Sequence, residues 1–408
     1  MKRITLDQLP AKLARLPDQP RVVASGNFAT PTELLAAVDH SLAGYTLHML
    51  NAQGKLPLRP GVQHETTFVG PGMRKTPDLR YVPCRLSLVP VLFHRRLPPD
   101  LVLIHTSGIE ESHVSLGLEV NILPAAIEAV RKRGGLVIAQ VNRQMPYTYG
   151  DSELHADEID YYIEVDSPLT ASPPPTLDDV SRAIGTRIAD QVPHGATIQL
   201  GIGAVPDAVL SGLTEHRDMR VWTEMFSDGI LALDERGCLS TEVPLTASFI
   251  FGSQTLYDWV DHNTRVRMMR TETVNDPARI AKQRIMTSVN GALQVDLSAQ
   301  ANASRINGRI YSGFGGSTDF IVGALHSRGG HAYIALPSWH PKADKSTVVP
   351  LIREPVTSFQ HSAVVTEQGM ARVFGNTEAE QTRQIIEHCA HPDARPELWE
   401  AAREMGRV

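Results

Sequence analysis

A nearly continuous apolar run, Leu101-Val102-Leu103-Ile104-His105, constrains the fold of this chain more than any other stretch. Strands that face water on one side alternate apolar and polar residues, whereas strands covered on both faces are apolar almost throughout. Similar runs occupy residues 21–24 and 136–141, and a helical segment at about 123–133 leads into the second of them. Strand, helix and strand in this order predict βαβ units and a mostly parallel sheet flanked by helices.

The second half of the chain repeats this rhythm. We expect a helix at about 177–192, a strand at 196–200, a helix at 206–213 and a strand at 219–222. Further strands are expected at 248–251, 266–269, 332–336 and 363–366. The two halves therefore have a similar predicted architecture, although no convincing residue-level repeat relates them.

Three consecutive prolines, Pro173-Pro174-Pro175, separate the two halves. They lack backbone donors and stiffen the chain, which favours a linker. A chain of 408 residues is long enough for two domains, each with a full core. The predicted fold class is therefore α/β, with an N-terminal domain at 1–171, a proline-rich linker at 172–176 and a C-terminal domain at 177–408.

The composition excludes several classes of protein. A net charge of -6 disfavours a long basic surface for nucleic acid, although a local basic pocket for phosphates is compatible with it. Cys84, Cys238 and Cys389 lie far apart without metal-ligand spacing, which favours a reducing cytoplasm. No stretch approaches the roughly 18 apolar residues of a membrane span. We expect a soluble cytoplasmic protein whose partner is a small molecule, neither nucleic acid nor membrane.

Glu224, within the stretch 223–229, is the carboxylate with the strongest claim to chemistry. The predicted strand at 219–222 delivers it to a carboxyl end, where ligands bind in open parallel sheets. A lone glutamate in such a place often only complements a helix dipole, and Asp228 fits that role as the N-cap of the next helix. Glu224 stands out because glycine-rich stretches, at 199–203 and 312–317, precede and follow it.

The two glycine stretches differ in what they allow. Gly201-Ile202-Gly203 links a strand to a helix, but Pro206 replaces the third glycine of the dinucleotide fingerprint and no acidic strand end follows at the proper distance. The alternatives are a plain turn and a turn whose N–H groups hold an oxyanion or phosphate. The later stretch, with Gly313, Gly315 and Gly316, either lets a ligand approach the backbone or is a structural turn.

Other chemistries gain no support from the sequence. His388 and His391 are close enough to share a metal, but Pro392 ends the helix there and no second ligand pair is apparent, so we expect no metal site. Neither a Gly-x-Ser-x-Gly elbow nor a phosphate-binding lysine loop occurs. Hydrolysis by a serine nucleophile and nucleoside triphosphate chemistry are therefore disfavoured.

An ordered series of motifs, spread over most of the chain, resembles the acetyl-CoA hydrolase/transferase family. This family includes 4-hydroxybutyrate CoA-transferases and belongs to the class I CoA-transferases. The ordered series is more specific than any one of its motifs. It comprises residues 26–31, 81–83, 114–117, Asn142 with 145–146, 199–203, 223–229, 312–320, 365–369 and 390–392.

The resemblance implies two domains of the CoA-transferase type and a nucleophilic role for Glu224. In such enzymes the glutamate attacks an acyl-CoA thioester and becomes a covalent glutamyl-CoA thioester. The substrates are then a CoA thioester and small carboxylates, with no permanently bound cofactor and no metal. The resemblance further implies that Gly316 donates its N–H near the thioester, that Gln199 orients Glu224, and that CoA or the acyl group contacts Gln199, Leu200, Gly201, Ile202, Gly203, Gly313, Gly315, Gly316 and Lys342.

Three departures from the family pattern concern the substrate more than the reaction. Trp222 replaces a common histidine, Thr318 replaces a small glycine, and residues 110–113 replace an Asp-x-x-Gly turn. Two alternatives to an acyl-CoA:carboxylate CoA-transferase stay open: a thioester hydrolase, in which water resolves the glutamyl thioester, and a catalytically silent CoA-binding protein. The resemblance also implies a homodimer or a dimer of dimers.

Overall fold

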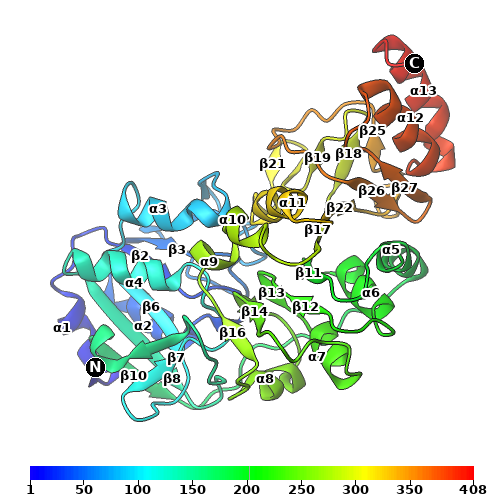
Figure 1. The fold of residues 1–408 in the computed structure, drawn as a ribbon. Coiled ribbons are helices and arrows are strands. Elements are labelled where there is room, and N and C mark those ends of the chain that lie inside the picture. Colours follow the sequence, from blue (N-terminus) through cyan, green and yellow to red (C-terminus); the bar gives the residue numbers. More distant parts are fainter. Residues whose placement is uncertain (202) are drawn as a thin grey trace. The chain divides into compact units, whose positions relative to one another are not determined.

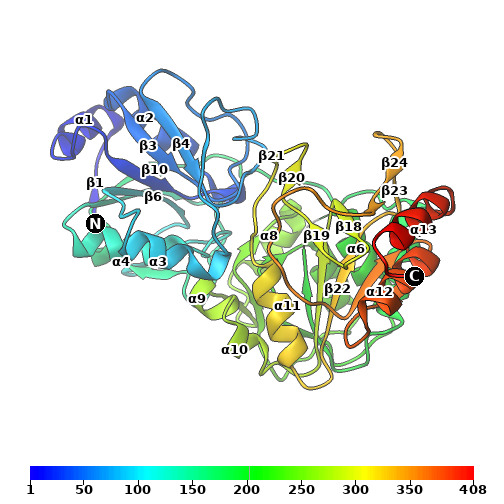
Figure 2. The ribbon, with the colours of Figure 1, turned by 90° about the horizontal axis from the view of Figure 1, so that it is seen from above.

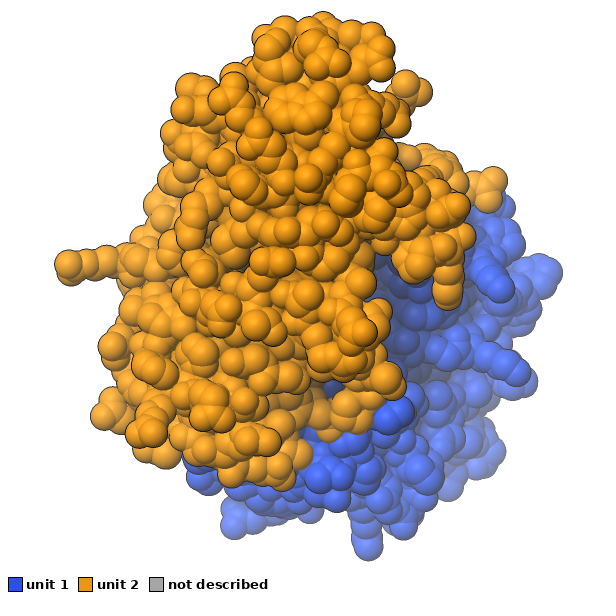
Figure 3. All heavy atoms as spheres, turned by 90° about the vertical axis from the view of Figure 1, so that its right-hand side faces the viewer, with its two compact units in different colours: residues 1–173, 245–274, 310–315 blue, residues 174–244, 275–309, 316–408 orange. Residues whose placement is uncertain are grey.

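The computed structural model describes residues 1–201 and 203–408. These residues form two compact units (Figure 3): the first holds 1–173, 245–274 and 310–315, and the second holds 174–244, 275–309 and 316–408. The chain first leaves unit 1 inside the three-proline run and later returns to it twice. The division into domains at 1–171 and 177–408 stays a prediction.

Unit 1 is built on an eight-stranded sheet in which every neighbouring pair is parallel (Figure 1). The predicted strands at 21–24, 101–105 and 136–141 are confirmed. Two central strands, Leu101–Thr106 and Leu136–Asn142, contain the apolar runs at 101–105 and 136–141. Every residue of these two strands is buried, as expected for strands with two covered faces. The strand order is β1 (Lys2–Arg3), β10 (Tyr161–Val165), β8 (Leu136–Asn142), β6 (Leu101–Thr106), β2 (Arg21–Ala24), β3 (Tyr45–His48), β4 (Val62–Thr66) and β5 (Arg80–Tyr81).

Two pairs of helices cover this sheet (Figure 2). On one face, α1 (Leu9–Leu13) and α2 (Thr32–Ser41) bury leucines against alternate residues of the central strands. On the other face lie α3 (Val89–His94) and α4 (Leu123–Lys132), and the apolar residues of α4 are all buried. Smaller elements complete the unit: β7 (His113–Ser115), β9 (Glu153–His155), β14 (Leu245–Ala247), β15 (Phe249–Ile250), α8 (Gln254–Val260), β16 (Val266–Met268) and α9 (Thr271–Val274).

Unit 2 has a six-stranded sheet that is parallel except at one edge, where β27 runs antiparallel to β26. The predicted strands at 196–200, 219–222, 332–336 and 363–366 are confirmed within one or two residues at their ends. The strand order is β12 (Arg220–Val221), β11 (Thr197–Leu200), β17 (Met286–Gly291), β22 (His331–Ala335), β26 (Ala363–Thr366) and β27 (Gly369–Arg372).

Helices flank this second sheet as well. α5 and α6 pack against each other, and α11 packs over β17 and β22. The helices of the unit are α5 (Asp179–Ala189), α6 (Ala204–Gly212), α7 (Asp228–Glu235), α10 (Pro277–Ile280), α11 (Ser317–His326), α12 (Glu378–His388) and α13 (Arg395–Glu404). Short strands β13 (Met225–Phe226), β18 (Gln294–Asp296), β19 (Ala301–Asn302), β20 (Arg305–Ile306), β23 (Trp339–His340), β24 (Lys345–Ser346) and β25 (Val348–Val349) lie between them in sequence.

The predicted α/β class, with two helix-flanked and mostly parallel sheets, is confirmed. In each sheet the strands that directly follow one strand, β2 in unit 1 and β11 in unit 2, are added on one side of it, and later strands are added on its other side. This reversal of strand order lies between β2 and β6 in unit 1 and between β11 and β17 in unit 2. Ligands of open parallel sheets bind at the carboxyl ends beside such a reversal of strand order. Among the described residues, no helix is long and apolar enough to cross a membrane.

Candidate active site

Glu224 lies just beyond the carboxyl end of β12, as its sequence position predicts. β12 is an edge strand that pairs in parallel with β11. The hydroxyl of Thr223 accepts from the Leu200 N–H at 3.4 Å and donates to the Leu200 carbonyl at 3.2 Å. The end of β12 is thereby tied to the end of β11, which places Glu224 beside the reversal of strand order in unit 2.

The Glu224 carboxyl group is held by two hydrogen-bond donors. The side-chain amide of Asn275 donates to Glu224 Oε1 at 2.8 Å, and the backbone N–H of Gly316 donates to the same carboxyl group. Asn275 follows α9 directly, and Gly316 is the residue before α11. The other amide atom, Asn275 Oδ1, is buried and has no hydrogen-bond partner among the described residues.

Burial dominates the protonation of Glu224 and raises its pKa to about 7. The nearby negative charge of Asp319 raises the pKa further, whereas the hydrogen bonds from Asn275 and Gly316 lower it. Asp319 is itself fully buried, in the first turn of α11. The carboxyl group therefore changes charge within the physiological pH range, which is characteristic of functional carboxylates.

Gly316 occupies a position where a side chain has no room. A Cβ atom there would overlap Glu224 Oε1 and the amide nitrogen of Asn275. The absence of a side chain lets the backbone approach the carboxyl group closely. The predicted donor Gly316 and the predicted nucleophile Glu224 thus lie together in unit 2, although their catalytic roles stay predictions.

The first glycine turn leaves open space in front of α6. Cβ atoms built on Gly201 or Gly203 would meet no other atom within 4 Å, and Gly203 has a φ of 119° that favours glycine. Gly203 directly precedes α6, and the N–H groups of a first helical turn have no partner within the helix. Ile202, also predicted to contact the substrate, lies outside the described residues.

Gln199 is buried in β11 and is engaged with the neighbouring strand β17. Its Oε1 atom accepts from the Ser288 hydroxyl at 2.6 Å and from the Asn290 amide at 3.4 Å. Leu200, the next residue, is also buried. The predicted contacts of Gln199 and Leu200 with CoA, and the orientation of Glu224 by Gln199, stay predictions.

The second glycine stretch is divided between the two units. Gly313 and Gly315 belong to unit 1, where Cβ atoms on them would lie 2.7 Å from the Thr67 carbonyl oxygen and 3.1 Å from the Phe68 ring, respectively. Gly315 also has a φ of 55°. Close packing at both positions, and the left-handed backbone at Gly315, explain structurally why glycine is found there. Contact of these two glycines with CoA stays a prediction.

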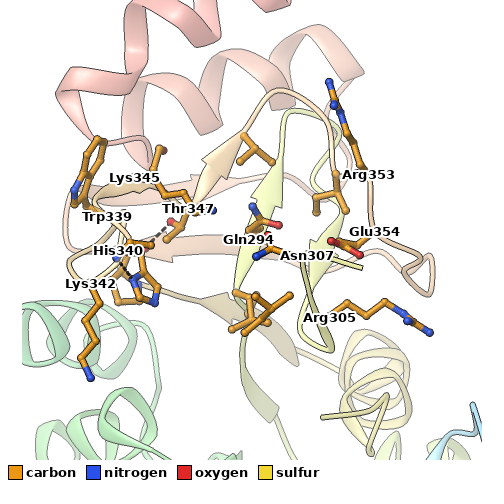
Figure 4. Close-up of a pocket in the computed structure, with 18 of the residues that line it drawn as sticks. Gln294, Arg305, Asn307, Trp339, His340, Lys342, Lys345, Thr347, Arg353 and Glu354 are labelled. Atoms are coloured by element: carbon orange, nitrogen blue, oxygen red, sulfur yellow. Dashed lines mark hydrogen bonds between the residues drawn. The ribbon is translucent and has the colours of Figure 1, made fainter. Parts of the chain in front are cut away.

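Lys342 lies on the hairpin of β23 and β24, which borders a pocket of about 740 Å³ in unit 2. Figure 4 shows Trp339, Lys342 and Lys345 on one side of this pocket, with Arg305, Arg353 and Glu354 on the other. Four basic side chains and one carboxylate give the wall a positive balance. Glu224, Asn275 and Gly316 are not among the lining residues.

The helix after Glu224 begins differently from the prediction. Ser227, with an extended backbone, is the N-cap of α7, and Asp228 is the first helical residue. The prediction that Asp228 is the cap was therefore wrong by one position. Its carboxylate still lies in the first turn, where a negative charge is favourable. The described residues contain no group of three or more His, Cys, Asp or Glu side chains that could hold a metal ion.

The sequence did not reveal Asn275 or assign a role to Asp319. Asn275 is 51 residues away from Glu224 along the chain and belongs to no motif. Asp319 follows the second glycine stretch, but only the fold shows that it is buried near another carboxylate. Two of the three departures from the family pattern can be placed here: Trp222 directly precedes Thr223, and Thr318 lies in the first turn of α11. Their effect on the acyl group stays a prediction.

Unit 1 also contains a buried carboxyl group with a raised pKa. Glu119 Oε1 accepts from the amides of Asn27 at 3.0 Å and Asn121 at 2.9 Å, and the backbone N–H of Gly26 also donates to this group. Glu119 Oε2 is buried and has no hydrogen-bond partner among the described residues. Burial raises the pKa of Glu119 to about 7. Gly26 and Asn27 follow β2, so this group lies beside the reversal of strand order in unit 1.

Family models match most of the chain. Residues 20–172 match the acetyl-CoA hydrolase/transferase N-terminal domain, and residues 252–402 match the acetyl-CoA hydrolase/transferase C-terminal domain. Glu224 lies between the two matched ranges.

Relatives and solved structures agree with these matches. A 4-hydroxybutyrate coenzyme A transferase from Clostridium kluyveri is 36% identical over 95% of this chain and 94% of its own length. An acetyl-CoA hydrolase from Saccharomyces cerevisiae is 31% identical over 68% of this chain and 56% of its own length. Among structures, RipA from Yersinia pestis has a TM-score of 0.91 at 26% identity, covering 100% of this chain and 98% of its own. A 4-hydroxybutyrate CoA-transferase from Porphyromonas gingivalis has a TM-score of 0.83 at 30% identity, covering 99% and 98%.

Proposed function

Because this chain belongs to the acetyl-CoA hydrolase/transferase family, whose members include CoA-transferases, we propose that it moves CoA between small carboxylic acids through a covalent glutamyl-CoA thioester on Glu224. The observation that carries the proposal is the Glu224 carboxyl group itself. It is held by Asn275 and Gly316, its pKa is about 7, and it lies at the carboxyl end of a parallel sheet.

The proposed reaction consists of four successive acyl substitutions. A Glu224 oxygen attacks the thioester carbon of the donor acyl-CoA, and the carbon–sulfur bond breaks to release CoA thiolate. The thiolate then attacks Cδ of Glu224 in the mixed anhydride, and the donor leaves as a carboxylate with the bridging oxygen. The acceptor carboxylate attacks the glutamyl thioester and releases the thiolate again. Attack of the thiolate on the second anhydride yields the new acyl-CoA and restores the Glu224 carboxylate.

The surroundings of Glu224 suit these steps. Each tetrahedral species carries a negative oxygen, and a positioned backbone donor such as the Gly316 N–H can stabilise it. A carboxylate removed from water is a stronger nucleophile than a hydrated one, since fixed donors replace its hydration shell. The hydrogen bond from Asn275 fixes the direction from which Glu224 attacks. Every step of the proposed cycle forms or breaks a bond to the Glu224 carboxyl group.

The basic pocket beside Lys342 fits the phosphate groups of CoA. CoA carries a pyrophosphate and a ribose phosphate, and the four basic side chains of the pocket are placed on two sides of an open space of about 740 Å³ (Figure 4). We therefore propose that Lys342, together with Lys345, Arg305 and Arg353, offers positive charge to the CoA phosphates in this pocket. The glycine turn at Gly201 and Gly203 offers N–H groups to the thioester end.

Hydrolysis is the second candidate, because acetyl-CoA hydrolases occur among the relatives. It differs only in whether water or a carboxylate resolves the glutamyl thioester. We propose transfer as the main activity since relatives similar over nearly the whole chain are named as transferases. Butyrate, succinate and 4-hydroxybutyrate are the acceptors to test first with acetyl-CoA as the donor. A homodimer or dimer of dimers in the cytoplasm also stays a prediction.

One experiment separates the candidates. The protein is incubated with acetyl-CoA, with and without each acceptor, and both free thiol and new acyl-CoA are measured. Transfer predicts new acyl-CoA only when an acceptor is present, with little thiol released. Thiol release regardless of acceptor would establish the hydrolase instead, and CoA binding without turnover would establish a silent protein. Mass spectrometry of peptides from the acetyl-CoA-treated enzyme should find CoA on Glu224; CoA on another residue would overturn the mechanism.

A further inference from the structure

The two hydrogen-bond donors to Glu224 lie at the points where the chain enters unit 2. Asn275 and Gly316 are the first residues of the segments 275–309 and 316–408, and each directly follows a segment of unit 1. Asn275 lies two residues before α10, and Gly316 is the N-cap of α11. Within unit 2 the positions of these donors therefore depend on the helices that follow them.

The helices α10 and α11 pack side by side (Figures 1 and 2). Gly323, a buried residue in the second half of α11, faces α10 at this contact. A Cβ atom on Gly323 would lie 2.4 Å from Cγ2 and 2.5 Å from Cβ of the buried Ile280, and 3.1 Å from the carbonyl oxygen of Pro277. Glycine is unfavourable inside a helix, so this close contact is the reason for it here.

A methyl group on Gly323 would force the two helices apart. Rotation of the Ile280 side chain cannot relieve the contact, because its Cβ atom is fixed to the backbone of α10. Carbon atoms in contact are ordinarily about 3.5–4.0 Å apart, so the backbone has to move by about 1 Å. α10 has four residues, whereas α11 has ten and also packs over β17 and β22. We therefore expect α10 to be the helix that moves.

Asn275 would move with α10. Its amide nitrogen lies 2.8 Å from Glu224 Oε1, and a contact lengthened to about 3.6 Å or more is no longer a hydrogen bond. We propose that Gly323 is a positioning residue: it lets α10 lie close enough to α11 for Asn275 and Gly316 to donate to Glu224 at once. This inference rests on the proposed role of Glu224 as the nucleophile, and it assigns no substrate contact to Gly323.

The charged groups on the two helices fix the sign of the expected effect. Asp319, on α11, raises the pKa of Glu224, whereas the hydrogen bond from Asn275 lowers it. On α10, Arg279 pairs with Asp276 of the same helix at 3.7 Å, and its side chain is 58% exposed. Displacement of α10 alone removes the Asn275 hydrogen bond and leaves Asp319 in place, so the pKa of Glu224 should rise.

The test compares wild type and Gly323→Ala in the pH profile of kcat/KM for CoA transfer. The acid limb, where kcat/KM falls at low pH, should move up by about one pH unit, and kcat at pH 8 should fall by up to about tenfold, because one hydrogen bond to a charged group is lost. The matched control is Gly185→Ala, at another buried helical glycine, whose Cβ would lie 2.5 Å from the backbone of Ala208 in α6. It should lower the Tm and leave the acid limb in place.

A double variant separates positioning from general damage to the enzyme. In Asn275→Ala the hydrogen bond is already absent, so adding Gly323→Ala should leave the acid limb in place and change kcat by no more than about twofold. An equal loss of kcat in both backgrounds would overturn the proposal. So would an acid limb that Gly323→Ala leaves unmoved, or one that Gly185→Ala moves as far.

Two further measurements keep the test decisive. Should Gly323→Ala fail to fold, as judged by its thermal unfolding, Ile280→Ala loosens the same contact from α10, and an unmoved acid limb in that variant refutes the role. Should wild type form no acyl-CoA with any acceptor, the proposed function itself fails. Carbon-13 NMR titration of Glu224, with its signal assigned by loss in Glu224→Gln, then measures the pKa without turnover. An equal pKa in wild type and Gly323→Ala refutes the positioning role on its own.

Discussion

Glu119 in unit 1 and Glu224 in unit 2 have buried carboxyl groups with similar pKa values but different surroundings. Each lies beside the reversal of strand order in its own sheet, and burial raises the pKa of each to about 7. Each accepts a hydrogen bond from an asparagine amide and another from a glycine N–H.

The difference lies in access. Glu119 is 1% exposed, and two asparagines hold the same oxygen, so it is enclosed by its own network. Glu224 is partly exposed and follows a strand tied to an open glycine turn at Gly201 and Gly203. A raised pKa therefore reports burial in both units and does not by itself mark a nucleophile; Glu224 differs from Glu119 in being a partly exposed residue near an open glycine turn.

The largest expected effect comes from exchanging the two carboxyl groups for amides. In the proposed mechanism Glu224→Gln removes the attacking oxygen, so no covalent intermediate can form and kcat for transfer should fall by on the order of 10⁴-fold or more. Glu119→Gln has the same change in chemistry and should keep most of the activity. Initial rates of acyl-CoA formation measure both. Loss of activity in Glu119→Gln together with an active Glu224→Gln would reverse the assignment of the nucleophile.

Gly316→Ala should have the next largest effect. The added methyl group would overlap the Glu224 carboxyl group and the Asn275 amide, so the N–H donor is displaced from the reacting centre. Loss of one such donor typically lowers kcat by about 10²–10³-fold. Gly291→Ala is the matched control, since its Cβ would find only one neighbour, at 3.9 Å. Equal kcat values for the two variants would show that close approach at Gly316 is not needed.

The fold was largely predictable from the sequence, and the site only in part. Runs such as 101–105 and 136–141 are apolar because both faces of their strands are covered, so local pattern and tertiary burial agree. Glu224 and Gly316 could be named from motifs. Asn275 and Asp319 could not, because only the folded sheet brings residues 275 and 319 to residue 224, and no local pattern records that approach.

The two glutamates can also be compared through stability. The folded-state pKa of Glu119, about 7, lies above its ordinary value of 4.5, so folding favours the protonated form. This contribution is complete below pH 4.5 and is lost as the pH rises through 7. Glu119→Gln cannot ionise, so between pH 5 and pH 8 its free energy of unfolding should rise relative to wild type by on the order of 3 kcal/mol. Urea unfolding at both pH values measures the change. Glu404→Gln, at the exposed end of α13, is the control, and an equal change there would remove the link to burial.

Asn275→Ala should have the smallest effect on rate and the clearest effect on its pH dependence. In the proposed mechanism Glu224 attacks as the carboxylate, so kcat/KM for transfer should fall as the pH drops through about 7. The hydrogen bond from Asn275 lowers the pKa of Glu224, and its loss should move this acid limb to higher pH. A hydrogen bond of typical net strength limits the loss of rate at pH 8 to about tenfold. Asn27→Ala removes the corresponding amide from Glu119 and should leave the acid limb in place, because the proposed transfer does not use that carboxyl group. An acid limb that moves with Asn27 and not with Asn275 would assign the titration to the enclosed carboxyl group of unit 1.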